Sequence, residues 1–77
     1  MAKTLVPVLA RHDTDGSITP IMVYWQDGKT FQIDKVIEKR QAASFKSGGV
    51  GIRYKCLIRG MAYHLFDEQG VWFIEKV

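Results

Sequence analysis

The sequence predicts an all-β domain, and three observations lead to this prediction. Apolar and polar residues alternate with a period of two, the pattern of strands with one buried and one solvated face. Turn-forming clusters separate these segments at a spacing of roughly ten residues. One segment is apolar on both faces, as in a strand covered on two sides. Together they indicate a small, strongly bent antiparallel sheet or a half-open SH3-like barrel of five or six strands.

The length and composition indicate one compact domain over residues 1–77. Cys56 is the single cysteine, so no internal disulfide can form, which favours a reducing compartment. No apolar run approaches the ~20 residues of a membrane span. The first seven residues lack a secretory pattern. We therefore expect a soluble cytoplasmic protein with no membrane partner.

Residues 3–12 are predicted to form the first strand, with Pro7 marking an edge or a bulge because proline cannot donate to a ladder. Residues 13–17 form a cluster of turn residues. Its aspartates are also typical of the start of a calcium loop, but the later ligands and flanking helices of an EF-hand are absent. A turn is therefore predicted there. Residues 18–26, apolar on both faces, are expected to form a central strand.

Asp27-Gly28 is the strongest short hairpin signal in the chain and predicts a third strand from residue 29 or 30, with Phe31 facing inward. Residues 34–45 fit two structures. One is a short helix within 36–45, and the other is a strand that is kinked by a bulge near Asp34-Lys35 and continues to Ala42. The segment lacks a convincing N-cap and a glycine close after its end, so the strand is favoured.

The clearest alternation lies between residues 46 and 60. Its apolar positions are Val50, Ile52, Tyr54, Cys56 and Ile58, and its basic positions are Arg53, Lys55 and Arg59. Arg59-Gly60 predicts a tight reversal into a strand over residues 61–66. Residues 67–70 predict a type I turn with a glycine bulge, and residues 71–76 predict the closing strand.

Basic residues are concentrated in the middle of the chain. Residues 35–59 contain seven Lys or Arg and one acid, a net charge of +6, whereas the remainder has a net charge of −3. Such a segment attracts phosphates or acidic proteins. Alternatively, it is a solvated face whose cations prevent strand edges from pairing with other chains.

Nucleic acid is the functional partner that this charge pattern predicts best. Basic residues along one strand face would lie about 6–7 Å apart, near the spacing of phosphates in a single strand. The candidate residues are Lys39, Arg40, Lys46, Arg53, Lys55 and Arg59. The competing hypothesis is a protein-interaction or self-association module, because a short chain with two-faced apolar strands can bury its excess apolar surface in a homodimer. The aromatic residues are expected in the core.

Catalysis, metals and cofactors are not predicted. If the hairpin centres on Gly60, Cys56 and His64 lie nearly opposite each other, but Cys56 shares an apolar face, where free cysteine behaves as a small hydrophobe. Three scattered Cys and His residues do not make a structural zinc site. The glycines of residues 48–51 lack the lysine and hydroxyl residue that follow in a P-loop.

Several segments together resemble a known family. They are Trp25 to Gly28, Phe31 to Val36, Ala42 to Ser44, Gly48 to Cys56 and Trp72 to Glu75. They are similar to small single-domain proteins of clostridia-like Gram-positive bacteria, a family with no assigned activity, cofactor or site. The resemblance covers nearly the whole chain and implies a bacterial cytoplasmic domain. A looser similarity to a domain encoded near translesion DNA polymerases implies a DNA-maintenance context.

Overall fold

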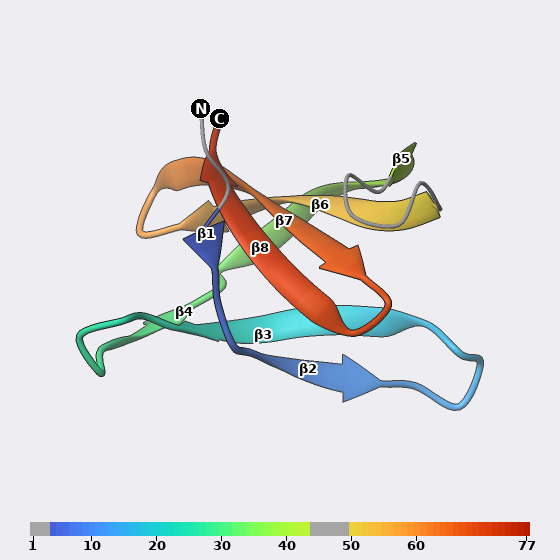
Figure 1. Cartoon of the computed structure of the whole chain (residues 1–77), viewed down its shortest axis with the longest axis horizontal. Coiled ribbons are helices and arrows are strands. Elements are labelled where there is room, and N and C mark those ends of the chain that lie inside the picture. Colours follow the sequence, from blue (N-terminus) through green and yellow to red (C-terminus); the bar gives the residue numbers. More distant parts are fainter. Residues whose placement is uncertain (1–3, 44–49) are drawn as a thin grey trace.

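The computed structural model of the protein describes residues 4–43 and 50–77, and these residues form strands and turns with no helix. One sheet has the strand order β1-β8-β7-β6-β5 and the other β2-β3-β4, and every ladder is antiparallel. The strands are β1 (Thr4–Leu5), β2 (Val8–His12), β3 (Ile18–Tyr24), β4 (Thr30–Gln32), β5 (Lys35–Ala43), β6 (Val50–Ile58), β7 (Met61–Glu68) and β8 (Val71–Lys76). The all-β prediction is confirmed, as two bent sheets rather than a closed barrel (Figure 1).

The first predicted strand bends at Val6-Pro7 and passes from one sheet to the other. The Val6 N–H donates to the carbonyl of Trp72 in β8, at 3.0 Å. The carbonyl of the following residue, Pro7, accepts from the N–H of Tyr24 in β3, also at 3.0 Å. Proline has no N–H to donate to a ladder, and it is therefore tolerated at a corner, where the ladder ends. One expected strand is therefore two, β1 and β2.

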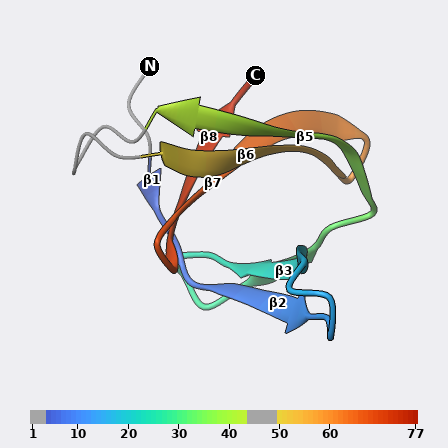
Figure 2. The ribbon, with the colours of Figure 1, turned by 90° about the vertical axis from the view of Figure 1, so that its right-hand side faces the viewer.

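A second corner at Ile33-Asp34 divides the segment between residues 29 and 43. The Ile33 N–H donates to Ile21 in the three-stranded sheet, and the Asp34 N–H donates to Leu57 in the five-stranded sheet, both at 2.9 Å. The two corners explain why eight strands form where five or six were predicted. They also place the sheets face to face as two layers (Figure 2).

Residues 35–43 form strand β5, so the helix alternative is wrong over this range. The chain kinks at Ile33-Asp34, close to the predicted position, but the ladder between β5 and β6 shifts further on, between Val36 and Glu38. The strand is stable here because β6 offers a nine-residue partner, and tertiary pairing overrides the moderate helix propensity of this segment.

Two tight hairpins join the last three strands. Arg59-Gly60 has φ values of 52° and 80°, and Gln69-Gly70 has 58° and 85°. Two successive positive φ values are typical of a type I′ turn, whose twist matches that of the flanking strands. The expected type I turn with a bulge at residues 67–70 is therefore wrong, since β7 continues to Glu68. The Asp67 carboxylate accepts from the Gly70 N–H at 2.8 Å and stabilises the tighter turn.

The core lies between the two sheets. Its buried residues include Val23 from the three-stranded sheet and Tyr54, Cys56, Leu65 and Trp72 from the five-stranded sheet. The ring of Tyr54 stacks on Trp72 with centroids 5.6 Å apart. Its hydroxyl donates across the layers to the Ile18 carbonyl at 3.1 Å. Tyr54 therefore joins the two sheets by packing and by a hydrogen bond.

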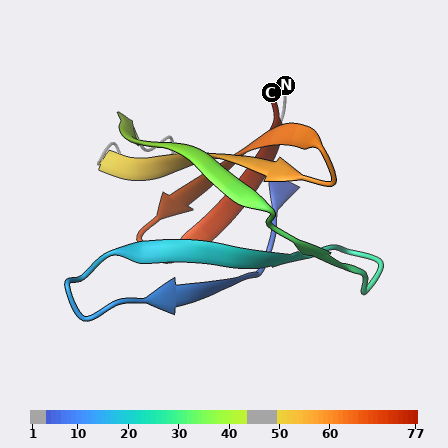
Figure 3. The ribbon, with the colours of Figure 1, turned by 180° about the vertical axis from the view of Figure 1, so that it is seen from behind.

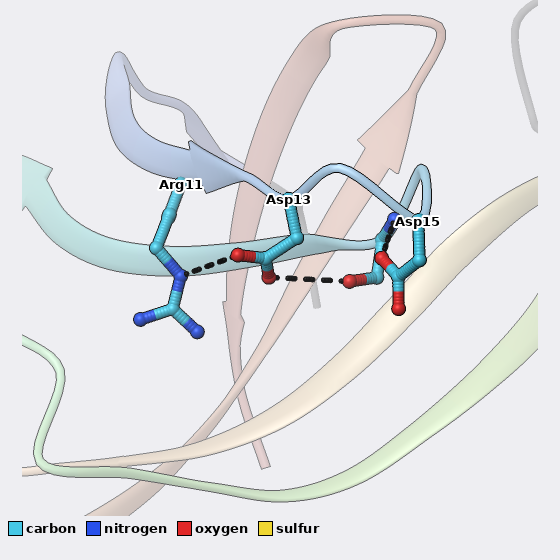
Figure 4. A network of polar contacts seen from close by, with 4 residues as sticks. Arg11, Asp13 and Asp15 are labelled. Atoms are coloured by element: carbon cyan, nitrogen blue, oxygen red, sulfur yellow. Dashed lines mark hydrogen bonds and ion pairs between the residues drawn. The ribbon is translucent and has the colours of Figure 1, made fainter.

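The acidic cluster at residues 13–17 is a turn, as predicted. The Asp13 carboxylate accepts from Arg11 at 3.0 Å and from the Ser17 hydroxyl at 3.2 Å, and Asp15 accepts from the Ser17 N–H at 2.9 Å (Figure 4). The bonds from Ser17 hold the pKa of Asp15 below its usual value. Both carboxylates therefore accept hydrogen bonds from residues in or next to the turn. Across residues 4–43 and 50–77, no three Cys, His, Asp or Glu side chains are grouped as metal ligands.

Candidate functional site

Three of the basic residues predicted from the sequence share one face of the five-stranded sheet. Arg40 in β5 is directly opposite Arg53 in β6, and Lys55 lies two residues further along β6. Arg53 and Lys55 alternate along β6 with Tyr54 and Cys56, which are buried in the core between the sheets. Successive side chains of a strand point to opposite faces, so Arg53 and Lys55 point away from the three-stranded sheet. We call Arg40, Arg53 and Lys55 the cationic cluster, and this side of the sheet its outer face.

One carboxylate lies within the cationic cluster. Glu38 is opposite Lys55 in the ladder. Its two oxygens contact Arg40 Nε at 3.2 Å and Arg53 Nη2 at 3.5 Å. These pairs are partly exposed, so they add little to stability. Their effect is to hold the two guanidinium groups side by side. One acid against three cations leaves the group with a net positive charge.

His64 and Phe66 of β7 extend the same face, and neither was predicted as a site residue. His64 is opposite Lys55, and Phe66 is opposite Arg53. The two rings pack edge to face with centroids 6.0 Å apart. Phe66 is buried although it lies outside the cluster of core residues. These neighbours can be identified only when the register of β6 against β7 is known, because His64 and Lys55 are nine positions apart in the sequence.

Burial lowers the pKa of His64 below its usual value, and the charges of Arg53 and Lys55 lower it further, against weaker opposing effects of Glu75 and Glu38. The imidazole at this position therefore resists protonation. This shift is a consequence of the short distance between β7 and the cations of the cluster.

The stability of the domain is expected to fall as the pH drops from 7.5 to 5.5. The unfolded chain then binds a proton at His64 that the folded chain binds less readily, which favours unfolding. In His64→Gln this part of the pH dependence should disappear. Urea unfolding at the two pH values measures it, with His12→Gln as the control for loss of an imidazole at an exposed position. An unchanged pH dependence in His64→Gln would contradict the expectation.

The other predicted basic residues do not join the cationic cluster. Lys39 lies on the opposite face of the sheet, with its Nζ 5.6 Å from the centre of the Tyr54 ring. Neighbouring residues of a strand point to opposite faces, so Lys39 and Arg40 cannot share one. Arg59 lies in the β6–β7 turn rather than on the strand. Lys46 lies outside the described residues.

A cleft of about 640 Å³ opens between the sheets at the end that holds the β6–β7 turn. Trp25, Phe31 and Tyr63 contribute to its lining, and Arg59 lies at the same cleft. The Arg59 guanidinium carbon is 6.0 Å from the centre of the Phe31 ring. We call this cavity the aromatic cleft. Trp25 and Phe31, expected in the core, are only partly buried.

Cys56 and His64 do not face each other. The two-residue turn pairs Cys56 with Tyr63 and Lys55 with His64. The expected pairing required a turn centred on Gly60, and a shift of one residue moves a side chain to the other face. Burial also raises the pKa of the Cys56 thiol to about 11, so the reactive thiolate is scarce near neutral pH.

Comparison of the chain with protein-family models, with curated proteins and with solved structures finds no match. Among the described residues, no helix has the length and apolar character needed to cross a membrane. The cationic cluster and the aromatic cleft are therefore the two features of the molecule that bear on its function.

Proposed function

We propose that this domain binds single-stranded nucleic acid, without enzymatic activity of its own, through the outer face of the five-stranded sheet. The observation that carries the proposal is the cationic cluster, in which Arg40, Arg53 and Lys55 are neighbours on one face of the β5–β6 ladder. Glu38 is the one acid that contacts the cluster's arginines among the described residues. The face is therefore suited to a polyanion.

The spacing of the cluster fits a phosphate backbone. Arg53 and Lys55 are two residues apart on a strand, which is about 6–7 Å. Guanidinium groups bind phosphate oxygens through two hydrogen bonds, and lysine binds them as a point charge. A phosphate bound at Arg53 would compete with Glu38 for the same guanidinium. Such contacts give affinity that depends on salt and little on sequence.

A salt-controlled titration against single- and double-stranded DNA and RNA tests this function. Three phosphate contacts to a single strand predict that the logarithm of the association constant falls with the logarithm of the salt concentration with a slope of about −2. Fluorescence anisotropy of end-labelled oligonucleotides provides the measurement. Absence of binding at low salt, or binding that salt does not weaken, would refute the proposal.

Self-association as a homodimer is the second candidate, and a separate apolar groove favours it. Leu5, Leu9 and Val71 line this groove with 58%, 47% and 43% of their surfaces exposed. A second copy of the chain would cover these side chains. Sedimentation equilibrium is expected to give twice the 8.8 kDa chain mass for the wild type and the chain mass for Leu9→Lys. A monomeric wild type at micromolar concentration would exclude this candidate.

A further inference from the structure

We propose that the aromatic cleft holds one unpaired nucleobase of the bound strand, an inference that rests on the proposed function. The cleft lies between the β3–β4 and β6–β7 turns, which occupy the same end of the molecule in both the front and the rear view (Figures 1 and 3). Its volume of about 640 Å³ is within the range of about 300–1,000 Å³ that is typical of small-molecule sites.

The lining of the cleft combines flat rings with an apolar floor. Trp25 and Phe31 come from the three-stranded sheet side and Tyr63 from β7, and all three are partly buried. Ile58 and Ile74 add aliphatic surface from the five-stranded sheet. Aromatic side chains that are held in place but still accessible are the usual platforms for bases of single strands, because every base has a π-face.

The lining of the cleft also includes basic residues, and a hydrogen bond ties the adjacent turn to the rest of the fold. Arg59 and Lys76 are the basic residues of the lining. The Arg59 backbone N–H donates to the Asp34 carboxylate at 2.9 Å, which ties the β6–β7 turn to the corner before β5. The guanidinium of Arg59 over Phe31 places a cation beside an aromatic face. A nucleotide carries the complementary pair, a planar base and an anionic phosphate. A purely aliphatic ligand would leave these charges unpaired.

The cleft is also within reach of the cationic cluster. Arg59 follows Lys55 by four residues at the end of β6, a distance of about 13 Å along an extended strand. This is the length of about two nucleotides at the phosphate spacing used above. The cluster lies on the outer face of the sheet and the cleft on its inner side, so a strand whose phosphates contact Arg53 and Lys55 would follow β6 to its end and pass around the β6–β7 turn at Arg59. A base at least two nucleotides beyond those phosphates would then enter the cleft.

The experiment compares two oligonucleotides with equal phosphates and different bases. One is a dT 12-mer, and the other is a 12-mer in which every nucleoside is an abasic tetrahydrofuran unit. Both are titrated at 0.1 M salt by anisotropy. The proteins are the wild type, Phe31→Leu and Trp25→Leu, which lose an aromatic ring of the cleft but keep an apolar side chain. Tyr24→Leu, beside Trp25 but exposed, is the matched control.

The wild type is expected to bind the dT 12-mer about 5- to 150-fold more tightly than the abasic 12-mer, which is the contribution of one stacked base. Phe31→Leu or Trp25→Leu should remove most of this difference, and Tyr24→Leu should retain it. Circular dichroism checks that each variant is folded. If one of the two cleft variants fails to fold, the affinities of the other variant test the inference. If both fail to fold, the difference between the affinities of the wild type for the dT and the abasic 12-mer tests it.

The negative outcomes separate the two proposals. Equal affinity of the wild type for both 12-mers, with weaker binding only in Arg53→Ala/Lys55→Ala, would overturn the cleft inference and leave the proposed function standing. A preference for dT that both folded cleft variants retain would overturn the cleft as its source. Failure of the wild type to bind either 12-mer would overturn the proposed function, and the cleft inference with it.

Discussion

Replacing Arg53 and Lys55 together with alanine is expected to weaken binding of a single-stranded oligonucleotide by roughly 10- to 30-fold at 0.1 M salt. Each lost phosphate contact removes the release of about 0.7 counterion, so the salt slope should also flatten by about 1.4. Arg53 and Lys55 are adjacent on the outer face. Their removal also leaves Glu38 with Arg40 as its remaining guanidinium partner among the described residues.

The matched control is Arg11→Ala/Lys39→Ala, which removes the same charge from elsewhere. Arg11 pairs with Asp13 at the end of β2, and Lys39 lies on the opposite face of the sheet from the cluster. The control should lose little affinity. Equal losses from the two double variants would show that binding depends on total charge, and the cationic cluster would then not be the site.

Truncation of Tyr54 to alanine is expected to destabilise the domain by about 3–5 kcal/mol, as for other buried aromatic side chains. The ring is 2% exposed and stacks on Trp72. A domain of this length has a total stability of about 4–12 kcal/mol. The substitution should therefore unfold a large fraction of the protein or shift its urea midpoint strongly.

Two further variants separate the causes of this effect. Tyr54→Phe keeps the ring and loses the hydrogen bond to the Ile18 carbonyl, so it should cost about 1 kcal/mol. Tyr24→Ala, an exposed tyrosine, should change stability by about 0.5 kcal/mol or less. Urea unfolding followed by circular dichroism provides all three values. A loss in Tyr54→Ala no larger than that in Tyr24→Ala would mean that Tyr54 does not join the sheets.

The all-β class and most strand positions could be predicted from the amino-acid sequence, because they depend on local patterns. Alternation over residues 50–58 predicted that Tyr54, Cys56 and Ile58 would be buried, and they are. The reversal at Arg59-Gly60 was also local, since a two-residue turn needs positive φ at both positions. The basic character of the middle of the chain follows from composition alone.

Which of those charges lie together depends on the pairing of the strands in the folded domain. The register of β5 against β6 placed Arg40 beside Arg53 and turned Lys39 to the other face. The two-residue turn shifted the register of β6 against β7 by one residue, so that Tyr63 rather than His64 lies opposite Cys56 and His64 lies opposite Lys55. A strand pattern has a period of two, so a shift of one residue exchanges its faces, and only the pairing of strands specifies that shift.

The corners at Val6-Pro7 and Ile33-Asp34 were likewise beyond local patterns. Each corner exists because successive backbone groups find partners in two different sheets, and a buried backbone group without a partner is costly. The second corner aligned the three-stranded sheet with the β6–β7 turn, which placed Arg59 over Phe31 and left the aromatic cleft open. Local sequence sets the faces of single strands, whereas long-range hydrogen bonding between strands sets which faces meet.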